Sequence, residues 1–287
     1  FTPKLIKEFK RKNLFFNLGQ SHKLLTPAMK FENEGLIYNS KTEKLLHDII
    51  QSTKTSLSNQ GVFRNFLLYG PPGTGKTLFA KKLALYSGLS YAILTGGDVV
   101  PLREKAVTEI HKVFDWSARN RGLILFLDEA DAFLKKRDQV NMGEEMRSAL
   151  NSFLYRTGGI SNNLMLILAT NKPEHLDRAV TDRIDMMIEF PLPDAPTRER
   201  LFHYYFTLRV ESKANQQDFN LNDVIDELVT SSDGFSAREI AKMCLSWETS
   251  ALSNNSRKIT KPLIIDEVKN MRKQNETKRT WNKLEHR

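Results

Sequence analysis

The chain has 287 residues, of which 40% are hydrophobic and 27% charged, a composition typical of a globular protein with a substantial core. No apolar run approaches the about 18 residues that a membrane-spanning helix needs, and the single cysteine, Cys244, excludes an internal disulfide and a cysteine-based zinc cluster. The 43 Lys and Arg against 34 Asp and Glu give a net charge of +9. This excess favours phosphate-rich partners or anionic membrane surfaces without selecting one, so direct nucleic-acid binding stays open.

Residues 1–34 are predicted to be a basic connector. Positive charge is concentrated in residues 4–12, and Pro3, Gly19 and Pro27 interrupt any regular element. Because the chain opens on phenylalanine rather than methionine, we expect a fragment or a processed product, with any upstream signal or anchor outside the sequence.

Residues 35–193 alternate short apolar runs with longer helical patterns, after a helix expected at residues 42–52. The expected strands are 66–69, 91–94, 123–127, 164–169 and 186–190. These runs are apolar throughout, as in strands covered on both faces, and the alternation predicts an α/β fold with a parallel five-stranded sheet between helices.

Residues 194–287 carry no strong strand pattern after Pro193, and they predict a smaller all-helical subdomain that ends in a basic helix. The expected helices are 198–209, 221–229, 236–252 and 263–273. Ser236 and Glu239 have the spacing of a capping box at the start of the third of these helices.

A glycine-rich loop follows the first expected strand and precedes a helix, which is the context that a phosphate-binding P-loop requires. Its residues are Gly70, Pro71, Pro72, Gly73, Thr74, Gly75, Lys76 and Thr77, with Leu78 next in the helix. The glycines allow backbone N–H groups to point at phosphate oxygens, and the helix adds its positive dipole end. Lys76 is expected to neutralise the β- and γ-phosphates of ATP, and the hydroxyl of Thr77 to ligate Mg²⁺.

Two carboxylates end the expected strand at residues 123–127. Asp128 is predicted to hold magnesium near the P-loop, and Glu129 to polarise the attacking water. The alternative is a solvated turn that happens to contain two acids.

Asn171 follows the expected strand at 164–169, which in the usual strand order lies between the first and third strands. There its carboxamide would orient the attacking water. The alternative is that Asn171 and Pro173 only begin a loop.

The spacing of these motifs and of the segment Asp182-Arg183-Ile184-Asp185 resembles the AAA clade of P-loop ATPases. This resemblance implies a ring in which Arg183 of one subunit stabilises charge on the γ-phosphate of a neighbour's ATP. The loop is shorter than is usual for the clade, so a contribution from Arg178 is doubtful. The alternative for Arg183 is an ion pair with Asp182 or Asp185.

The segment 234–240 resembles the sensor-2 segment of such ATPases. That resemblance implies that Arg238 contacts the phosphates of its own subunit and links lid position to the nucleotide state. Most close AAA relatives lack an arginine there, and the alternative is a surface arginine in the first helical turn.

Several longer segments resemble one AAA subfamily, the mitochondrial ATPase family AAA domain-containing protein 3 subfamily; they are Thr74 to Leu85, Tyr91 to Pro101, Phe126 to Leu134, Phe153 to Gly158 and Gly234 to Ala241. The resemblance implies an anchor in the mitochondrial inner membrane, an ATPase domain in the matrix, and links to mitochondrial nucleoids, cristae and cholesterol handling. It also implies a homo-hexamer, with ATP and Mg²⁺ as cofactors.

The target of such an ATPase is not evident from the sequence. Protein-threading rings present an aromatic residue to the pore, whereas residues 99–103 contain none; Leu102 or Arg103 could contact a polymer, or the stretch could be a plain loop. A slow ATP-gated scaffold is the alternative to a motor. No His-Glu-x-x-His motif occurs, so this region carries no zinc protease of that type.

Overall fold

The computed structural model describes residues 2–11, 35–120, 122–136, 143–210, 216–217, 219–253 and 258–285. Contacts divide the chain into two compact units, the first formed by residues 1–29 and 44–191 and the second by residues 30–43 and 192–287. Within the described part, no helix is both long and apolar enough to cross a bilayer.

A six-stranded sheet forms the centre of the first unit, in the order β1-β3-β4-β5-β2-β6. The strands are β1 (Glu8–Lys10), β2 (Phe66–Tyr69), β3 (Ser90–Thr95), β4 (Leu123–Asp128), β5 (Leu164–Thr170) and β6 (Met186–Glu189). β2 to β6 are mutually parallel, which confirms the predicted α/β sheet. β1 is an additional, antiparallel strand, and it pairs with β3. The prediction of five strands missed it because three residues in a basic stretch give no apolar run.

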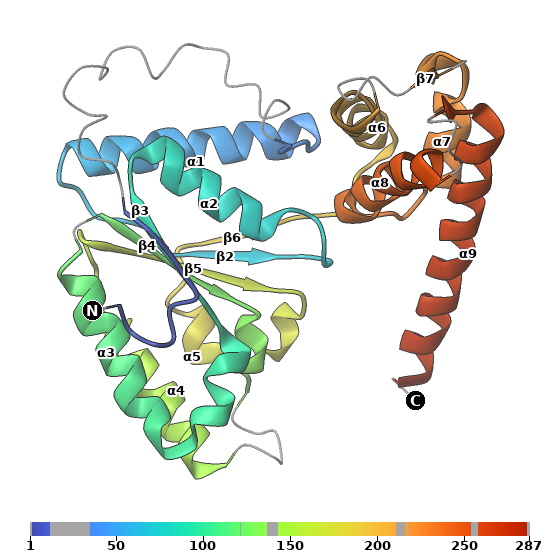
Figure 1. Ribbon diagram of the computed structural model, residues 1–287. Helices are drawn as coiled ribbons and strands as arrows, with labels where there is room; N and C mark the ends of the chain where they lie inside the picture. Colours follow the sequence, from blue (N-terminus) through green and yellow to red (C-terminus); the bar gives the residue numbers. More distant parts are fainter. Residues whose placement is uncertain are drawn as a thin grey trace. The chain divides into compact units, whose positions relative to one another are not determined.

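Helices cover both faces of this sheet (Figure 1). α1 (Ser40–Ser58) and α2 (Lys76–Ser87) lie on one face, and α3 (Ala106–Ala118), α4 (Glu144–Arg156) and α5 (Arg178–Thr181) on the other. Short 3-10 turns connect several elements; they are η3 (Gly96–Asp98), η4 (Val100–Lys105), η5 (Ala130–Ala132) and η6 (Pro173–His175). α3 begins only at Ala106, because η4 takes up the residues around Pro101.

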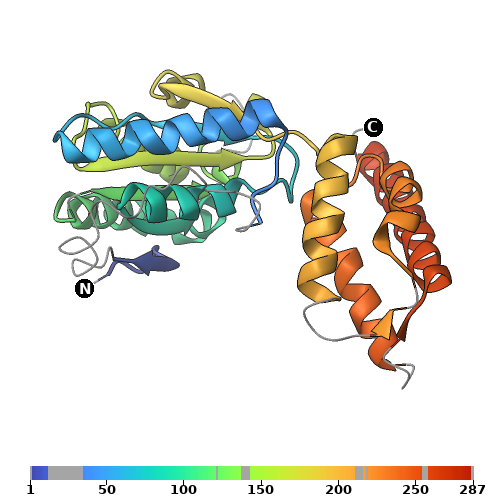
Figure 2. The same ribbon diagram turned by 90° about the horizontal axis from the view of Figure 1, so that it is seen from above.

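The N-terminal segment is attached to the edge of the sheet by β1, opposite the β6 edge (Figure 2). Leu5 is buried in the apolar core of the unit. The ring of Phe9 packs edge-on against Trp116 of α3, with 4.9 Å between the ring centroids. Part of the sequence expected to be a connector is therefore built into the first unit.

Polar contacts reinforce this attachment. Glu8 accepts hydrogen bonds from Lys81 Nζ at 2.6 Å and from the hydroxyl of Tyr91 at 2.5 Å, and Lys7 pairs with Asp98 at 3.0 Å. The hydrogen bond from Lys81, followed by that from Tyr91, lowers the pKa of the Glu8 carboxyl. Burial and then the bond to Glu8 raise the pKa of Tyr91 to about 12. Both shifts favour the charge state in which the contact exists.

The second unit is mainly helical, with α6 (Ala195–Arg209), η8 (Leu221–Asp223), α7 (Ile225–Ser231), α8 (Ala237–Ser253) and α9 (Lys261–Glu285). Its core includes Phe202, Phe206, Cys244 and Trp247, all 1% exposed or less. The prediction of an all-helical subdomain was wrong in one detail, because two short parallel strands pair there, β7 (Gln216–Gln217) with β8 (Lys258–Ile259). Two-residue strands leave no periodic signal.

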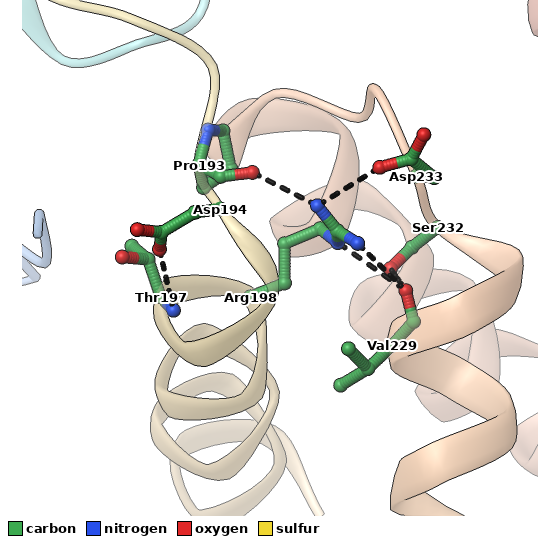
Figure 3. A network of polar contacts seen from close by, with 7 residues as sticks. All are labelled: Pro193, Asp194, Thr197, Arg198, Val229, Ser232 and Asp233. Atoms are coloured by element: carbon green, nitrogen blue, oxygen red, sulfur yellow. Dashed lines mark hydrogen bonds and ion pairs between the residues drawn. The ribbon is translucent and has the colours of Figure 1, made fainter.

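A buried arginine, Arg198, connects three parts of the second unit (Figure 3). Its guanidinium donates to the carbonyl oxygen of Pro193 at 3.0 Å and twice to that of Val229, at 3.1 and 3.3 Å. It also lies 3.2 Å from a carboxylate oxygen of Asp233. The start of α6 is thereby fixed to the end of α7.

The predicted capping box at α8 is confirmed, since Ser236 and Glu239 exchange backbone-to-side-chain hydrogen bonds.

Candidate ATP site

The carboxyl ends of three neighbouring strands carry the predicted site. β5 lies between β2 and β4, which confirms the predicted position of the strand before Asn171. Tyr69 at the end of β2 is in register with Thr170 at the end of β5. Because the carboxyl ends of parallel strands meet at one edge, the P-loop, Asp128 and Asn171 lie at the same side of the sheet, where α/β proteins bind ligands.

The P-loop ends at the N-terminus of α2. Gly75 is the N-cap residue with φ 96°, a left-handed conformation that favours glycine. Gly75 has no side chain with which to cap the helix, and Lys76, Thr77 and Leu78 form its first turn, the part of a helix whose backbone N–H groups bind anions. Leu78 itself is partly exposed and offers the site only its backbone. The loop is braced from within, since Thr74 Oγ1 donates to the carbonyl of Pro71 at 2.9 Å.

Lys76 is buried, with 7% of its surface exposed. Its ammonium donates three hydrogen bonds of 2.8 Å each, to the carbonyl oxygens of Gly70 and Pro71 and to Oδ1 of Asn171. A lysine held at the mouth of a P-loop is placed to exchange loop carbonyls for phosphate oxygens. Its charge acts strongly there because the surroundings screen it less than water does.

Thr77 and Asp128 form the candidate magnesium site. The hydroxyl of Thr77 donates to Asp128 Oδ2 at 2.8 Å, and Asp128 Oδ1 accepts from the backbone N–H of Glu129 at 3.0 Å. Both side chains offer the hard oxygen ligands that Mg²⁺ prefers. Within the described residues, no group of three or more His, Cys, Asp or Glu side chains is close enough to hold a metal alone. This pair therefore fits a magnesium ion whose remaining ligands are phosphate oxygens and water, as is common in nucleotide sites.

Glu129 is exposed and has a left-handed backbone, with φ 50° and ψ 46°. This conformation is unusual for a residue with a Cβ and is maintained by the surroundings. One support is Gly96, because a Cβ on Gly96 would lie 2.4 Å from the carbonyl oxygen of Glu129. The absence of a side chain at Gly96 therefore leaves room for the backbone that presents Glu129, a role that the sequence patterns did not reveal.

Arg183 lies away from this cluster within its own chain. Its Nε donates to the carbonyl of Leu154 at 3.1 Å and its Nη1 to that of Ala179 at 2.6 Å. These partners are backbone carbonyls, not the aspartates that the alternative named. Asn65 Nδ2 donates to the carbonyl of Arg183 at 3.3 Å, and Asn65 directly precedes β2, whereas the P-loop follows it. Four residues of strand span about 13 Å at about 3.3 Å per residue. Arg183 therefore lies at the amino-terminal ends of the strands, whereas the site lies at their carboxyl ends.

Arg178 and Arg238 are both exposed. Arg178 is the first residue of α5, and Arg238 lies in the first turn of α8 in the second unit. The contact of Arg238 with phosphates stays a prediction. Residues 99–103 are the stretch that lacks the aromatic residue of protein-threading rings. In it, Leu102 packs partly against the core, whereas Arg103 is exposed with φ 46°.

Comparison with known proteins agrees with this geometry. Residues 66–192 match the family described as "ATPase family associated with various cellular activities (AAA)". The chain carries an AAA domain. It is 45% identical over 260 residues to ATPase family AAA domain-containing protein 3-B of Xenopus laevis, an alignment that covers 88% of this chain and 44% of that protein. The chain spans less than half the length of this relative.

Two further relatives are similar to the chain to the same extent. ATPase family AAA domain-containing protein 3A of Homo sapiens is 44% identical over 260 residues, 88% of this chain and 44% of that protein. The Drosophila melanogaster homolog of 3A is 43% identical over 256 residues, 86% of this chain and 42% of that protein. The resemblance to this subfamily that the sequence motifs suggested is thus confirmed.

Proposed function

We propose that the AAA domain hydrolyses ATP in the presence of Mg²⁺. The observation that carries the proposal is the pair of 2.8 Å side-chain bonds, Lys76 to Asn171 and Thr77 to Asp128, beside the exposed carboxylate of Glu129. In this proposal Lys76 and the first amides of α2 bind the β- and γ-phosphates. When bound, Mg²⁺ neutralises phosphate charge, and Thr77 and Asp128 are the side chains that would hold it.

The attacking water is the part of the reaction assigned to Glu129 and Asn171. The Glu129 carboxylate accepts a proton from the water, and the Asn171 carboxamide orients it toward the γ-phosphate. Both side chains are exposed at the carboxyl edge of the sheet. This leaves them accessible to a nucleotide bound at the P-loop.

The proposal extends to a homo-oligomeric ring, specifically a homo-hexamer. The position of Arg183 supports a ring, because its backbone lies beside Asn65, at the ends of the strands remote from the P-loop of the same chain. An arginine there serves hydrolysis by contacting nucleotide held by a neighbouring subunit. Arg238 is proposed to contact phosphates within its own subunit.

A second candidate function is a slow ATP-gated scaffold. It is favoured by the two hydrogen bonds that keep the Arg183 guanidinium on the carbonyls of Leu154 and Ala179 in its own chain. Those bonds must break before Arg183 reaches nucleotide in a neighbour, so turnover would be slow even in an assembled ring.

The cellular setting is proposed from the resemblance to the subfamily alone: a matrix-facing ATPase attached to the mitochondrial inner membrane through an upstream segment, with a nucleoid or a protein as its substrate. Fractionation of mitochondria tests the placement. A protease-protected protein that resists alkaline extraction in the full-length form supports it, and recovery outside mitochondria contradicts it.

The test of the enzymatic proposal is the rate of ATP hydrolysis as a function of protein concentration, with and without a hexamerising fusion. We expect a rate that rises cooperatively and that Glu129→Gln and Arg183→Ala each abolish. Matched controls are Glu174→Gln and Arg64→Ala, which remove an exposed carboxylate and an exposed guanidinium of the same unit. A 1:1 mixture of Lys76→Ala with Arg183→Ala should recover part of the rate, because each supplies what the other lacks.

The outcomes separate the two candidates. A background rate in enforced hexamers, with ATP still bound, contradicts the motor and favours the scaffold. A rate that is independent of concentration and of Arg183 contradicts the ring.

A further inference from the structure

A buried hydroxyl at the end of β5 connects the turn of Glu129 with the position of Asn171. Thr170 is 1% exposed, and its Oγ1 donates a 2.5 Å hydrogen bond to Oδ1 of Asp131. Asp131 belongs to η5, which directly follows Glu129. A short bond from a hydroxyl to a carboxylate is among the stronger hydrogen bonds in proteins. It joins the segments that supply the two groups proposed to handle the attacking water.

This bond lies where the backbone pairing of β4 and β5 has stopped. The register of these strands runs from Leu123 opposite Leu164 to Leu127 opposite Leu168. Asp128 and Thr170 lie past the last pair. The bond between Thr170 and Asp131 therefore extends the connection of the two strands beyond their ladder.

On one side, the hydroxyl fixes the backbone around Asn171. Thr170 Oγ1 accepts a 3.0 Å hydrogen bond from the backbone N–H of Lys172. The residues before and after Asn171 are thus joined through a single oxygen atom. The Asn171 carboxamide, which accepts from Lys76, projects from a backbone held on both sides.

On the other side, Asp131 belongs to the same hydrogen-bonded turn as Glu129. The N–H of Ala132 donates to the carbonyl of Glu129 at 3.0 Å, and that of Phe133 to the carbonyl of Ala130 at 3.1 Å. Ala130 and Phe133 are 0% and 1% exposed, which anchors the turn in the core. A shift of Asp131 therefore shifts the backbone of Glu129.

We propose that Thr170 and Asp131 are positioning residues for ATP hydrolysis, and that their hydrogen bond sets the separation of Glu129 and Asn171. Neither side chain contacts the reacting atoms. The inference rests on the proposed ATPase activity and adds to it the device that holds its two water-handling groups in register. Displacements of about 1 Å in such a pair lower rates about 100-fold, whereas they leave ground-state binding of nucleotide largely intact.

The experiment compares kcat, the KM for ATP, the Kd of a non-hydrolysable ATP analogue and the thermal midpoint for a set of variants of the full chain. Thr170→Val removes the hydroxyl at nearly constant shape, Thr170→Ser retains it, and Asp131→Ala removes its partner. Ser117→Ala is the matched control, because Ser117 is also buried and its hydroxyl donates to a carbonyl within α3, outside the site.

We expect Thr170→Val and Asp131→Ala each to lower kcat about 10- to 100-fold, with the Kd of the analogue within about 3-fold of wild type. Thr170→Ser should recover most of kcat. The double variant should be no slower than the slower single variant, because both changes break one bond. Ser117→Ala should leave kcat and KM unchanged.

Two results would overturn the inference while the proposed function stands: a wild-type kcat in Thr170→Val, or equal losses of kcat, nucleotide affinity and thermal midpoint, which indicate a general structural role. A wild-type chain that shows no turnover in any assembly state contradicts the proposed function itself, and the inference with it.

Discussion

The ammonium of Lys76 and the carboxamide oxygen of Asn171 lie 2.8 Å apart, although 95 residues separate them in the sequence. The contact ties the start of α2 to the end of β5. It also fixes which way the Asn171 amide faces, since only its oxygen can accept from an ammonium. The NH₂ group of that amide is left to donate to a water or a phosphate oxygen.

Asn171→Ala is therefore expected to lower kcat about 100-fold while the nucleotide Kd changes by less than about 3-fold. The reason is that Lys76 keeps its two carbonyl partners and its place in the loop. Steady-state kinetics and titration with a fluorescent ATP analogue measure both effects. Asn120→Ala, which removes an amide that donates to a carbonyl in α3, is the control. A parallel fall in affinity and kcat would contradict a role confined to the chemical step.

Gly96→Ala is expected to abolish hydrolysis, because the new Cβ would lie 2.4 Å from the carbonyl of Glu129 and force its turn to move. A loss of stability of about 1–3 kcal/mol should accompany it, as for other overpacked sites. Gly97→Ala is the matched control one residue away, where the nearest atom to a Cβ is 4.0 Å distant. Chemical denaturation and ATPase rates of the two variants give the comparison. Hydrolysis and stability in Gly96→Ala that match those of an active Gly97→Ala would mean that the turn tolerates the displacement.

The docking of β1 is expected to depend on pH through Glu8 and Tyr91. The folded pKa of Glu8 lies below its ordinary 4.5, so its contribution is present above pH 4.5 and lost as the pH falls through the lowered value. The folded pKa of Tyr91 is raised from 10 to about 12, so its contribution is present below pH 10 and lost as the pH rises toward 12. The protection factors of the β1 amides, which correct the exchange rates for the pH dependence of exchange in an unfolded chain, should therefore be highest between these limits.

Glu8→Gln should remove the acid limb of that profile and speed exchange at neutral pH. Glu109→Gln, which breaks an ion pair with Lys112 within α3, is the control for a lost carboxylate. An unchanged acid limb in Glu8→Gln would assign the effect to another group.

Arg198→Ala is expected to destabilise the second unit by about 2 kcal/mol or more, because the carbonyls of Pro193 and Val229 lose charge-assisted partners. Arg272→Ala, which breaks only an exposed contact with Glu276, should change the stability by less than about 0.5 kcal/mol. The free energy of unfolding in urea measures both. A result for Arg198→Ala that matches the control would show that the network in Figure 3 contributes no net stability.

Long apolar runs and fixed motif spacings made the central sheet and the P-loop predictable. β2, β4 and β5 are continuous buried strands, and Asp128 and Asn171 follow from where such strands end. The prediction failed where an element has no period of its own. β1 is three residues long and gains its stability from Trp116, Lys81 and Tyr91, all distant in sequence.

The candidate site was predicted only as far as its groups are proposed to contact ATP, magnesium or the attacking water. Thr170 and Gly96 stand beside predicted residues, yet their partners, Asp131 and the carbonyl of Glu129, become neighbours only through the fold. Arg183 shows a different limit. Its motif indicated a role in a neighbour's site, and no sequence pattern reveals that its resting partners are carbonyls of α4 and α5.

The way β1 joins the sheet bears on how the domain responds to tension. Residues 8–10 run antiparallel to residues 91–93, so a pull along the strand axis loads all of their hydrogen bonds at once, whereas a pull across the edge opens them one after another. Leu5, buried just before the strand, adds an apolar hold at the end nearest the N-terminus. The hydrogen bonds between β1 and β3 therefore resist a force along the strand better than the same force applied across the edge of the sheet.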